Sequence, residues 1–250
     1  MTVTSIFNFL CLELYCALSD TFEDTYTGFT GFRVVFEGLK TYFLKAIPSA
    51  FICCLSWWHY ELLIIFAGIL GKEQLAAFAI VTNLSFLAFD ISYAIACSSS
   101  TFVSFFLRIQ EAELAKKYSR YALLFSLISM MLICLLVFAA GSTLAAMYTN
   151  IKEVADTFKS VISLAVIHIF IDSIQNVINS VLRGLGLGTF GFVFTIFAYY
   201  LVGVPLAVKL AFFSEIGILG LLLAQVTAAA VLSVIVVLIM QCSDWKKLND

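Results

Sequence analysis

One apolar stretch of the sequence carries six polar side chains at helical spacing: His168, Asp172, Gln175, Asn176, Asn179 and Arg183. In a helix all six lie on one face, with the imidazole and the carboxylate one turn apart. Hydrogen bonding between helices explains a single amide in such a position, whereas six in register favour a water-accessible stripe. His168 either relays protons for Asp172 or is a plain hydrogen-bonded histidine.

Two further acidic residues interrupt other apolar stretches. Glu61 follows Trp57 by one helical turn, and a carboxylate beside an aromatic ring can hold an organic cation. The alternative for Glu61 is a protonated, hydrogen-bonded and inert carboxylic acid. Asp90 shares a helical face with Asn83, so it either lines a cavity or has a paired structural role.

Such sites suit transport driven by an ion gradient. Burial favours the protonated form of a carboxyl group, which can then exchange a proton, bind sodium or bind a cationic substrate, but only one at a time. Mutual exclusion of this kind couples an antiporter. The sequence has no G-x-x-x-x-G-K-[ST] loop for ATP, so a gradient is the visible energy source.

Nothing in the sequence indicates enzyme chemistry. The seven cysteines form no C-x-x-C pair, and with only two histidines there is no zinc spacing. We therefore predict that the protein is not an enzyme, with no catalytic residues, no metal site and no cofactor other than a proton or sodium as coupling ion.

Composition identifies the elements that must position these residues. The chain is 62% apolar and 12% charged, with a net charge of −2. A soluble domain has about twice that charged fraction, and no basic field exists to bind nucleic acid. We predict an all-α, polytopic transmembrane helix bundle embedded in a lipid bilayer.

Six stretches are long enough to cross a bilayer, which takes roughly 20 apolar residues. The loops between them are short, which implies antiparallel neighbours in one bundle. A seventh apolar piece, Met1–Ser19, resembles the tail of a further helix. The six spans are Ala46–Leu70, Leu75–Leu107, Tyr121–Tyr148, Ser160–Leu182, Gly184–Val208 and Ile216–Ser243.

The chain then divides into four parts. Residues 1–19 are a partial transmembrane helix, and residues 20–45 are a cytoplasmic linker with an amphipathic interfacial helix. Residues 46–243 are a six-helix transmembrane lobe, and residues 244–250 are a cytoplasmic tail. Ten of the 14 Lys and Arg residues fall on the side of the linker and tail, so the positive-inside rule places the C-terminus in the cytoplasm.

Two aromatic-rich blocks resemble a known family. LSWWHYELLIIFAGILG (Leu55–Gly71) is similar to the seventh helix of eukaryotic multidrug and toxic compound extrusion (MATE) transporters, and VLRGLGLGTFGFVFTIFAYYLVGVP (Val181–Pro205) to the junction of their tenth and eleventh helices. The resemblance covers only the C-terminal half of the family. It implies one lobe of a two-lobe transporter in a plasma or vacuolar/endosomal membrane, which exports organic, often cationic, compounds in exchange for protons or sodium.

The resemblance also assigns residues. It implies that Glu61 and Asp172 carry the ion coupling, and Asn83 falls where plant members have an asparagine in the eighth helix. Tyr200 belongs to the second block. Together with His168 and Asn176 of the stripe, these form our predicted ion- and substrate-binding set: Glu61, Asp172, Asn83, His168, Asn176 and Tyr200.

Three hypotheses remain open. The first is a secondary antiporter or its C-lobe, whose partners are a small organic substrate and the missing N-terminal lobe or a second copy of the chain. The second is a truncated, non-transporting membrane protein that associates with a full-length relative. The third, a six-span channel, is disfavoured because no re-entrant filter or charge ring occurs.

Overall fold

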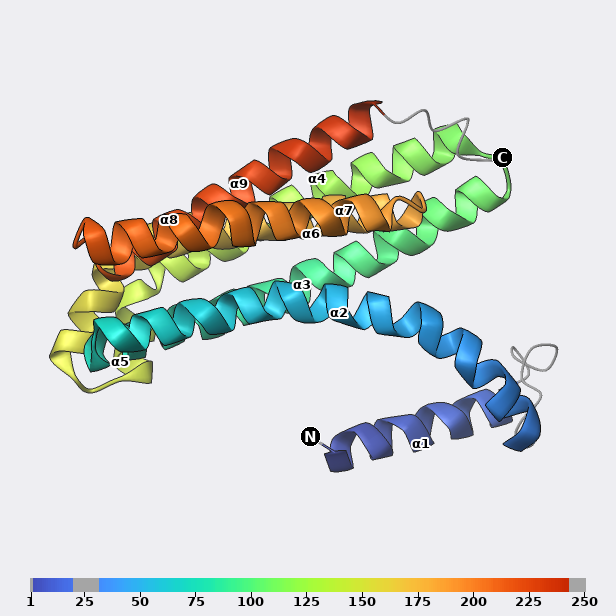
Figure 1. The fold of residues 1–250 in the computed structure, drawn as a ribbon, viewed down its shortest axis with the longest axis horizontal. Helices are drawn as coiled ribbons and strands as arrows, with labels where there is room; N and C mark the ends of the chain where they lie inside the picture. The colour runs from blue at the N-terminus through green and yellow to red at the C-terminus, as the bar shows by residue number, and fades with distance from the viewer. Residues whose placement is uncertain (1, 20–31, 243–250) are drawn as a thin grey trace. The chain divides into compact units, whose positions relative to one another are not determined.

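The computed structural model describes residues 2–19 and 32–242, and these contain helices and turns but no strand (Figure 1). The prediction of an all-α fold is therefore confirmed. The elements are α1 Thr2–Leu18, α2 Phe32–Leu70, α3 Lys72–Arg108, α4 Ala112–Ala139, α5 Gly141–Tyr148, α6 Lys152–Gly184, α7 Gly188–Ile196, η2 Phe197–Gly203, α8 Val204–Val208, η3 Lys209–Phe213 and α9 Ile218–Cys242.

The chain forms two compact units, residues 1–52 and 53–250. The first contains α1, whose large apolar side chains are exposed. Helix α2 runs unbroken from Phe32, so the described part of the predicted linker and the first predicted span form one helix. Residues 20–31 of the linker and the predicted tail 244–250 lie outside the described residues. The second unit holds all the residues discussed below.

Five helical stretches of the described residues are long and apolar enough to cross a membrane, and Trp57–Leu70 of α2 is a shorter apolar stretch. The predicted span Tyr121–Tyr148 differs from the structure, because α4 already begins at Ala112 and a turn at Ala140 separates it from α5. The earlier start is physically reasonable, since Lys and Arg side chains at a helix end can extend to the membrane surface.

The connection between α2 and α3 is a single residue, Gly71, with φ 137°. Side chains other than hydrogen rarely tolerate this backbone conformation. A glycine at this position therefore lets two long helices turn back on each other without a loop.

Helix α6 lies at the centre of the second unit and packs mainly against α3, then α9 and α4. Most of the apolar core around it falls into two clusters, with a small third one at Ala88, Cys134 and Ile169. One cluster contains Phe78 and Phe158 near the α2–α3 turn, and the other contains Val103 and Leu182 near the opposite ends of α3 and α6. Between them lies a layer of buried and half-buried polar side chains, here called the polar layer: His59, Tyr60, Ser92, His168, Asp172, Gln175, Asn176 and Tyr199.

The π-helical segment η2 supplies Tyr199 to this layer. A π-helical turn is wider than an α-helical turn and is frequent at functional sites. It changes which residues of the span face α6, and this determines the geometry of the site.

Candidate functional site

Asp172 lies at the centre of the polar layer. The Tyr199 hydroxyl lies 3.1 Å from Asp172 Oδ1 and 3.1 Å from Gln175 Oε1, so its single hydrogen is shared between two acceptors. The Tyr60 side chain of α2 also lies next to the Asp172 carboxyl group and interacts with it electrostatically. Two phenols from two other helices therefore hold this carboxylate, which is half-buried.

Two buried histidines flank the phenols. The His59 ring lies 4.7 Å from the Tyr199 ring, and the His168 ring lies 6.2 Å from the Tyr60 ring, measured between centroids. Both imidazoles are 1% exposed, and none of their four nitrogens has a hydrogen-bond partner in the described part of the chain. Leaving a buried polar atom unpaired costs about 1–3 kcal/mol, so these nitrogens can still form a hydrogen bond with a water molecule or with another polar group of the layer.

Two further hydrogen bonds join α6 to α3. Asn176 Nδ2 donates to Ser92 Oγ at 3.1 Å, and the Ser180 hydroxyl donates to the Ala96 carbonyl oxygen. The six predicted stripe residues do lie on one helix, but Gln175 is buried and Asn176 bonds across helices. For these two residues the structure favours interhelical hydrogen bonding over a water-accessible stripe.

Glu61 and Asn83 lie apart from this layer, because both side chains are exposed. Asp90 is exposed as well, and neither Glu61 nor Asp90 has an ion pair or hydrogen bond among the described residues. Beside them Trp57 packs on the Phe86 ring at 5.1 Å and on Phe89 at 6.0 Å. We call Glu61, Asn83, Asp90 and Trp57 the open face of α2 and α3.

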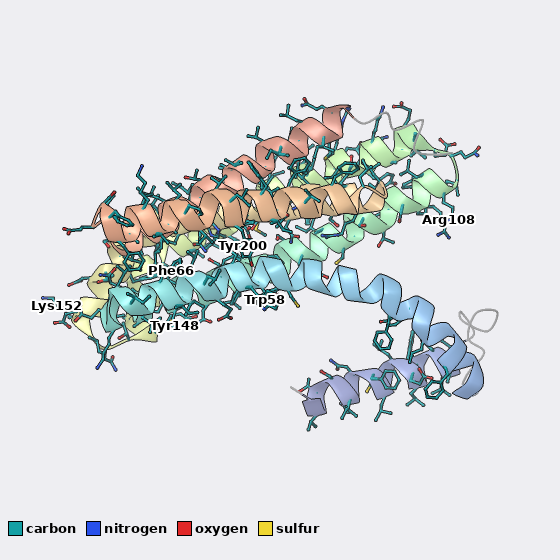
Figure 2. The ribbon with its side chains drawn as sticks, viewed as in Figure 1. Trp58, Phe66, Arg108, Tyr148, Lys152 and Tyr200 are labelled. Atoms are coloured by element: carbon teal, nitrogen blue, oxygen red, sulfur yellow. The ribbon has the colours of Figure 1, made fainter. Side chains whose placement is uncertain are left out.

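Tyr200 is half-buried, with its ring 6.2 Å from the His59 ring, and Figure 2 shows it between η2 and α2. Its neighbour Tyr199 makes the contacts with Asp172, and sequence reasoning left Tyr199, Tyr60 and His59 out of the site. A polar residue in an aromatic run was the available signal for His59. No sequence signal reveals the π-helical turn that places Tyr199, rather than Tyr200, against α6.

The described residues contain no group of three or more His, Cys, Asp or Glu side chains that could hold a metal ion. The polar layer offers instead one carboxylate, two phenols, two amides, two imidazoles and a serine hydroxyl. These groups suit the binding and release of a proton.

Comparison with known proteins gives the family. The family model MatE matches residues 48–208. The chain belongs to the MatE family. That match includes Glu61, Asn83, His168, Asp172, Asn176 and Tyr200.

Relatives of this MatE chain include Protein DETOXIFICATION 12 of Arabidopsis thaliana, which is 27% identical over 218 residues. Multidrug and toxin extrusion protein 1 of Oryctolagus cuniculus is 28% identical over 221 residues. These alignments cover 86% and 88% of this chain but 45% and 38% of the relatives. The chain thus spans about half the length of the curated relatives it matches.

The structure agrees with this relationship. The crystal structure of the eukaryotic MATE transporter AtDTX14 matches with a TM-score of 0.88 and 26% identity, over 97% of this chain and 54% of that one. An outward-facing multidrug resistance MATE family transporter matches with a TM-score of 0.69 at 19% identity, which shows a shared fold. The chain is therefore an integral, multi-pass membrane protein with the fold of one MATE lobe.

Proposed function

We propose that this chain is the C-terminal lobe of a proton-driven antiporter that exports organic cations. The observation that carries the proposal is the contact of two phenols with Asp172 inside a MatE lobe. A carboxylate held by hydroxyl groups from separate helices changes its contacts when it takes up a proton, because a protonated carboxyl group donates as well as accepts. Proton binding at Asp172 thereby changes how α2 and η2 are held against α6.

The open face supplies the cation site. Glu61 provides a negative charge, and Trp57 provides an aromatic ring close to it on the same helix. A cation over an indole face gains about 0.5–2 kcal/mol, depending on desolvation. This combination favours organic cations, because their apolar groups also pack against the surrounding rings, whereas a metal ion gives up strong hydration without that gain.

Helix α2 connects the polar layer with the open face. Tyr60 and Glu61 are consecutive residues, one facing Asp172 and the other lying on the open face. A change at Asp172 that displaces Tyr60 must also move Glu61. We propose that proton uptake at Asp172 lowers the affinity of the open face for the cation, which is the coupling that an antiporter requires.

Reconstitution of the 250-residue chain tests the proposal. In liposomes with a pH gradient, the chain should bind tetraphenylphosphonium but show no gradient-driven uptake or release of it. Alternating access in two-lobe transporters needs both lobes. Sustained exchange by a monomeric chain would contradict its assignment as one lobe, and absence of tetraphenylphosphonium binding would contradict the cation site.

We further propose that the end of the bundle holding Arg108 and the α6 C-terminus faces the cytoplasm, as does the chain's C-terminus. Among the described residues of the second unit, this end carries five cations and two carboxylates: Arg108, Lys116, Lys117, Arg120 and Arg183 with Glu111 and Glu113. The other end, where Figure 2 shows Tyr148 and Lys152, carries four cations and four carboxylates: Lys72, Lys152, Lys159 and Lys209 with Glu73, Glu153, Asp156 and Glu215. Positive charge is enriched on the cytoplasmic side of membrane proteins.

Cysteine labelling tests this orientation. Ser119 lies among the basic residues of α4 but is buried, so its exposed neighbour Lys117 is the better position for labelling. In a chain with its native cysteines replaced, Lys152→Cys should react with an impermeant maleimide added to intact cells, and Lys117→Cys should react only after the cells are opened. The reverse pattern would overturn the orientation.

A further inference from the structure

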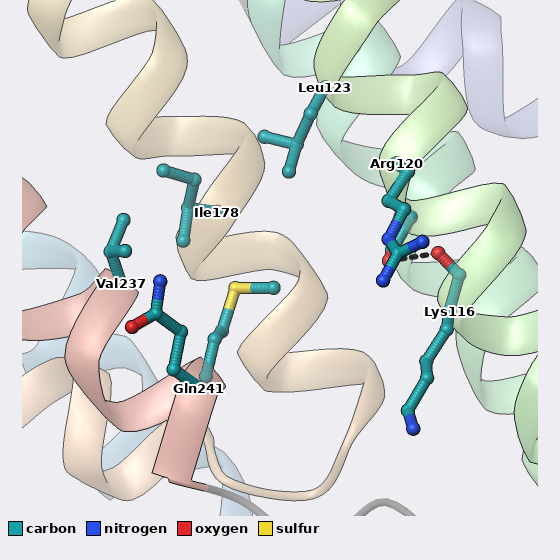
Figure 3. A pocket seen from close by; sticks show the side chains of 8 residues that line it. Lys116, Arg120, Leu123, Ile178, Val237 and Gln241 are labelled. Atoms are coloured by element: carbon teal, nitrogen blue, oxygen red, sulfur yellow. Dashed lines mark hydrogen bonds between the residues drawn. The ribbon is translucent and has the colours of Figure 1, made fainter.

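A hollow of about 350 Å³ opens at the basic end of the bundle, between α4, α6 and α9 (Figure 3). Lys116 and Arg120 of α4 form one side of it. Leu123 of α4, Ile178 of α6, and Val237 and Met240 of α9 form an apolar wall, beside which lie the Ser119 hydroxyl and the Gln241 amide. The hollow therefore has a cationic rim and an apolar wall, and it lies away from the polar layer.

A second hollow of about 440 Å³ adjoins the first, and Lys116 and Arg120 line both. The cations around them differ in how they are engaged. Lys116 lies 3.6 Å from the Glu113 carboxylate, and Lys117 lies over the Tyr121 ring at 5.8 Å. Arg120 has no ion pair among the residues that the structure describes, and its side chain is exposed. The guanidinium group is thus available to an anion.

The position of this rim matches the depth of lipid headgroups. Lys116 and Arg120 lie in the first turns of α4, before its most apolar stretch. A planar guanidinium group binds a phosphate through two parallel hydrogen bonds, and a nearby lysine adds a second positive charge. Acidic lipids are drawn to basic groups at this depth.

We propose that this hollow binds an anionic glycerophospholipid from the adjacent leaflet. Its phosphate lies between Arg120 and Lys116, and one acyl chain lies along Leu123, Ile178 and Val237. A soluble phosphate would use the two cations but leave the apolar wall uncovered. A zwitterionic lipid would cover the wall, but its headgroup would bring a further positive charge close to the cationic rim. Only an anionic lipid matches both surfaces.

The lipid also has a structural consequence. The hollow is bounded by α4, α6 and α9, so a bound lipid contacts three helices at once. A ligand that binds only the folded state stabilises it by mass action. We expect phosphatidylglycerol to raise the melting temperature of the purified chain more than phosphatidylcholine does.

Lipid binding to the purified chain in detergent tests the proposal. The probes are short-chain phosphatidylglycerol, phosphatidylcholine of the same chain length, deacylated glycerophosphoglycerol and inorganic phosphate, each titrated calorimetrically. Phosphatidylglycerol should bind at least about ten-fold more tightly than the other three, because it alone combines the anionic phosphate with acyl chains. Comparable affinity for phosphatidylcholine, or for either of the two soluble phosphates, would overturn the assignment.

Substitutions locate the site. Arg120→Gln should weaken phosphatidylglycerol binding about ten-fold, and Lys116→Gln should weaken it less because Glu113 already neutralises part of its charge. Lys159→Gln is the matched control, since it removes an exposed cation from α6 at the opposite end of the bundle. Unchanged binding in the Arg120→Gln, Lys116→Gln double variant, with an unchanged melting temperature in the absence of lipid, would contradict the proposal.

Discussion

The polar layer and the open face contain similar groups in different surroundings. In the polar layer Asp172 is half-buried and held by Tyr60 and Tyr199, whereas on the open face Glu61 is exposed and forms no hydrogen bond or ion pair with another described residue. A carboxylate fixed by several donors responds to a proton by rearranging its helices, and an exposed carboxylate responds to whatever cation approaches. We propose that this difference serves two tasks, proton exchange at Asp172 and cation binding at Glu61.

Removal of the Asp172 charge should have the largest effect. In the wild-type chain, acid should weaken tetraphenylphosphonium binding because a proton on Asp172 opposes it through Tyr60 and α2. Asp172→Asn should make the affinity independent of pH, because the variant lacks the group to which the proposal assigns the proton. Titrations at several pH values measure this. Asp156→Asn, which changes an exposed carboxylate on the same helix, is the control. If the binding of Asp172→Asn still depends on pH, the proton does not act through Asp172, and the proposed division between the polar layer and the open face is wrong.

Loss of a phenol should weaken the coupling without removing it. Hydrogen bonds to charged groups contribute about 1.5–3 kcal/mol, so Tyr199→Phe should reduce the pH-dependent change in affinity about ten-fold. Tyr60→Phe should reduce it as well, because it removes a hydroxyl group next to the Asp172 carboxyl group. Tyr148→Phe, outside the polar layer, should leave it unchanged. A full pH response in the Tyr60→Phe, Tyr199→Phe double variant would show that the phenols do not transmit the state of Asp172.

Changes on the open face should alter the affinity for the cation but not the pH dependence of that affinity. Glu61→Gln should weaken tetraphenylphosphonium binding about five- to ten-fold at every pH, since it removes the charge that holds the cation. Asp90→Asn should weaken tetraphenylphosphonium binding less than about three-fold. The reason is that Trp57, whose ring contributes to the cation site, belongs to the helix of Glu61 and not to that of Asp90. Should Asp90→Asn prove the more damaging, the cation would lie nearer α3 than α2.

The smallest effect is expected where the polar layer only joins helices. Asn176→Ala removes the hydrogen bond to Ser92, and such bonds between membrane helices contribute about 0.6–1 kcal/mol. The variant should unfold slightly earlier in denaturant but bind tetraphenylphosphonium with unchanged affinity and pH dependence. A clear change in pH dependence would place Asn176 within the coupling pathway rather than in the scaffold.

Hydrophobic length predicted the bundle well. A stretch of apolar residues long enough to cross a bilayer has few alternatives to a helix, and α3, α6 and α9 contain the predicted spans Leu75–Leu107, Ser160–Leu182 and most of Ile216–Ser243. Helix ends were less predictable, as α4 shows, because charged residues at the membrane surface continue a helix without any change in periodicity.

Several residues of the site could be predicted from the sequence, but the contacts between them could not. Spacing placed His168 and Asp172 on one face of α6, and the resemblance pointed to Glu61. Whether Tyr60 or Glu61 faces Asp172 depends on the rotation of α2, which packing determines. The choice between Tyr199 and Tyr200 depends on η2, whose wider turns leave no pattern in the sequence.

The most direct test of this division of tasks counts protons. Tetraphenylphosphonium is added to saturation in weakly buffered solution, and a pH indicator reports the protons released per bound cation. We expect wild type and Glu61→Gln to release the same number at saturation, although Glu61→Gln needs more cation, and Asp172→Asn to bind the cation without releasing any. Proton release that persists in Asp172→Asn, or that disappears in saturated Glu61→Gln, would contradict the assignment of the proton to Asp172.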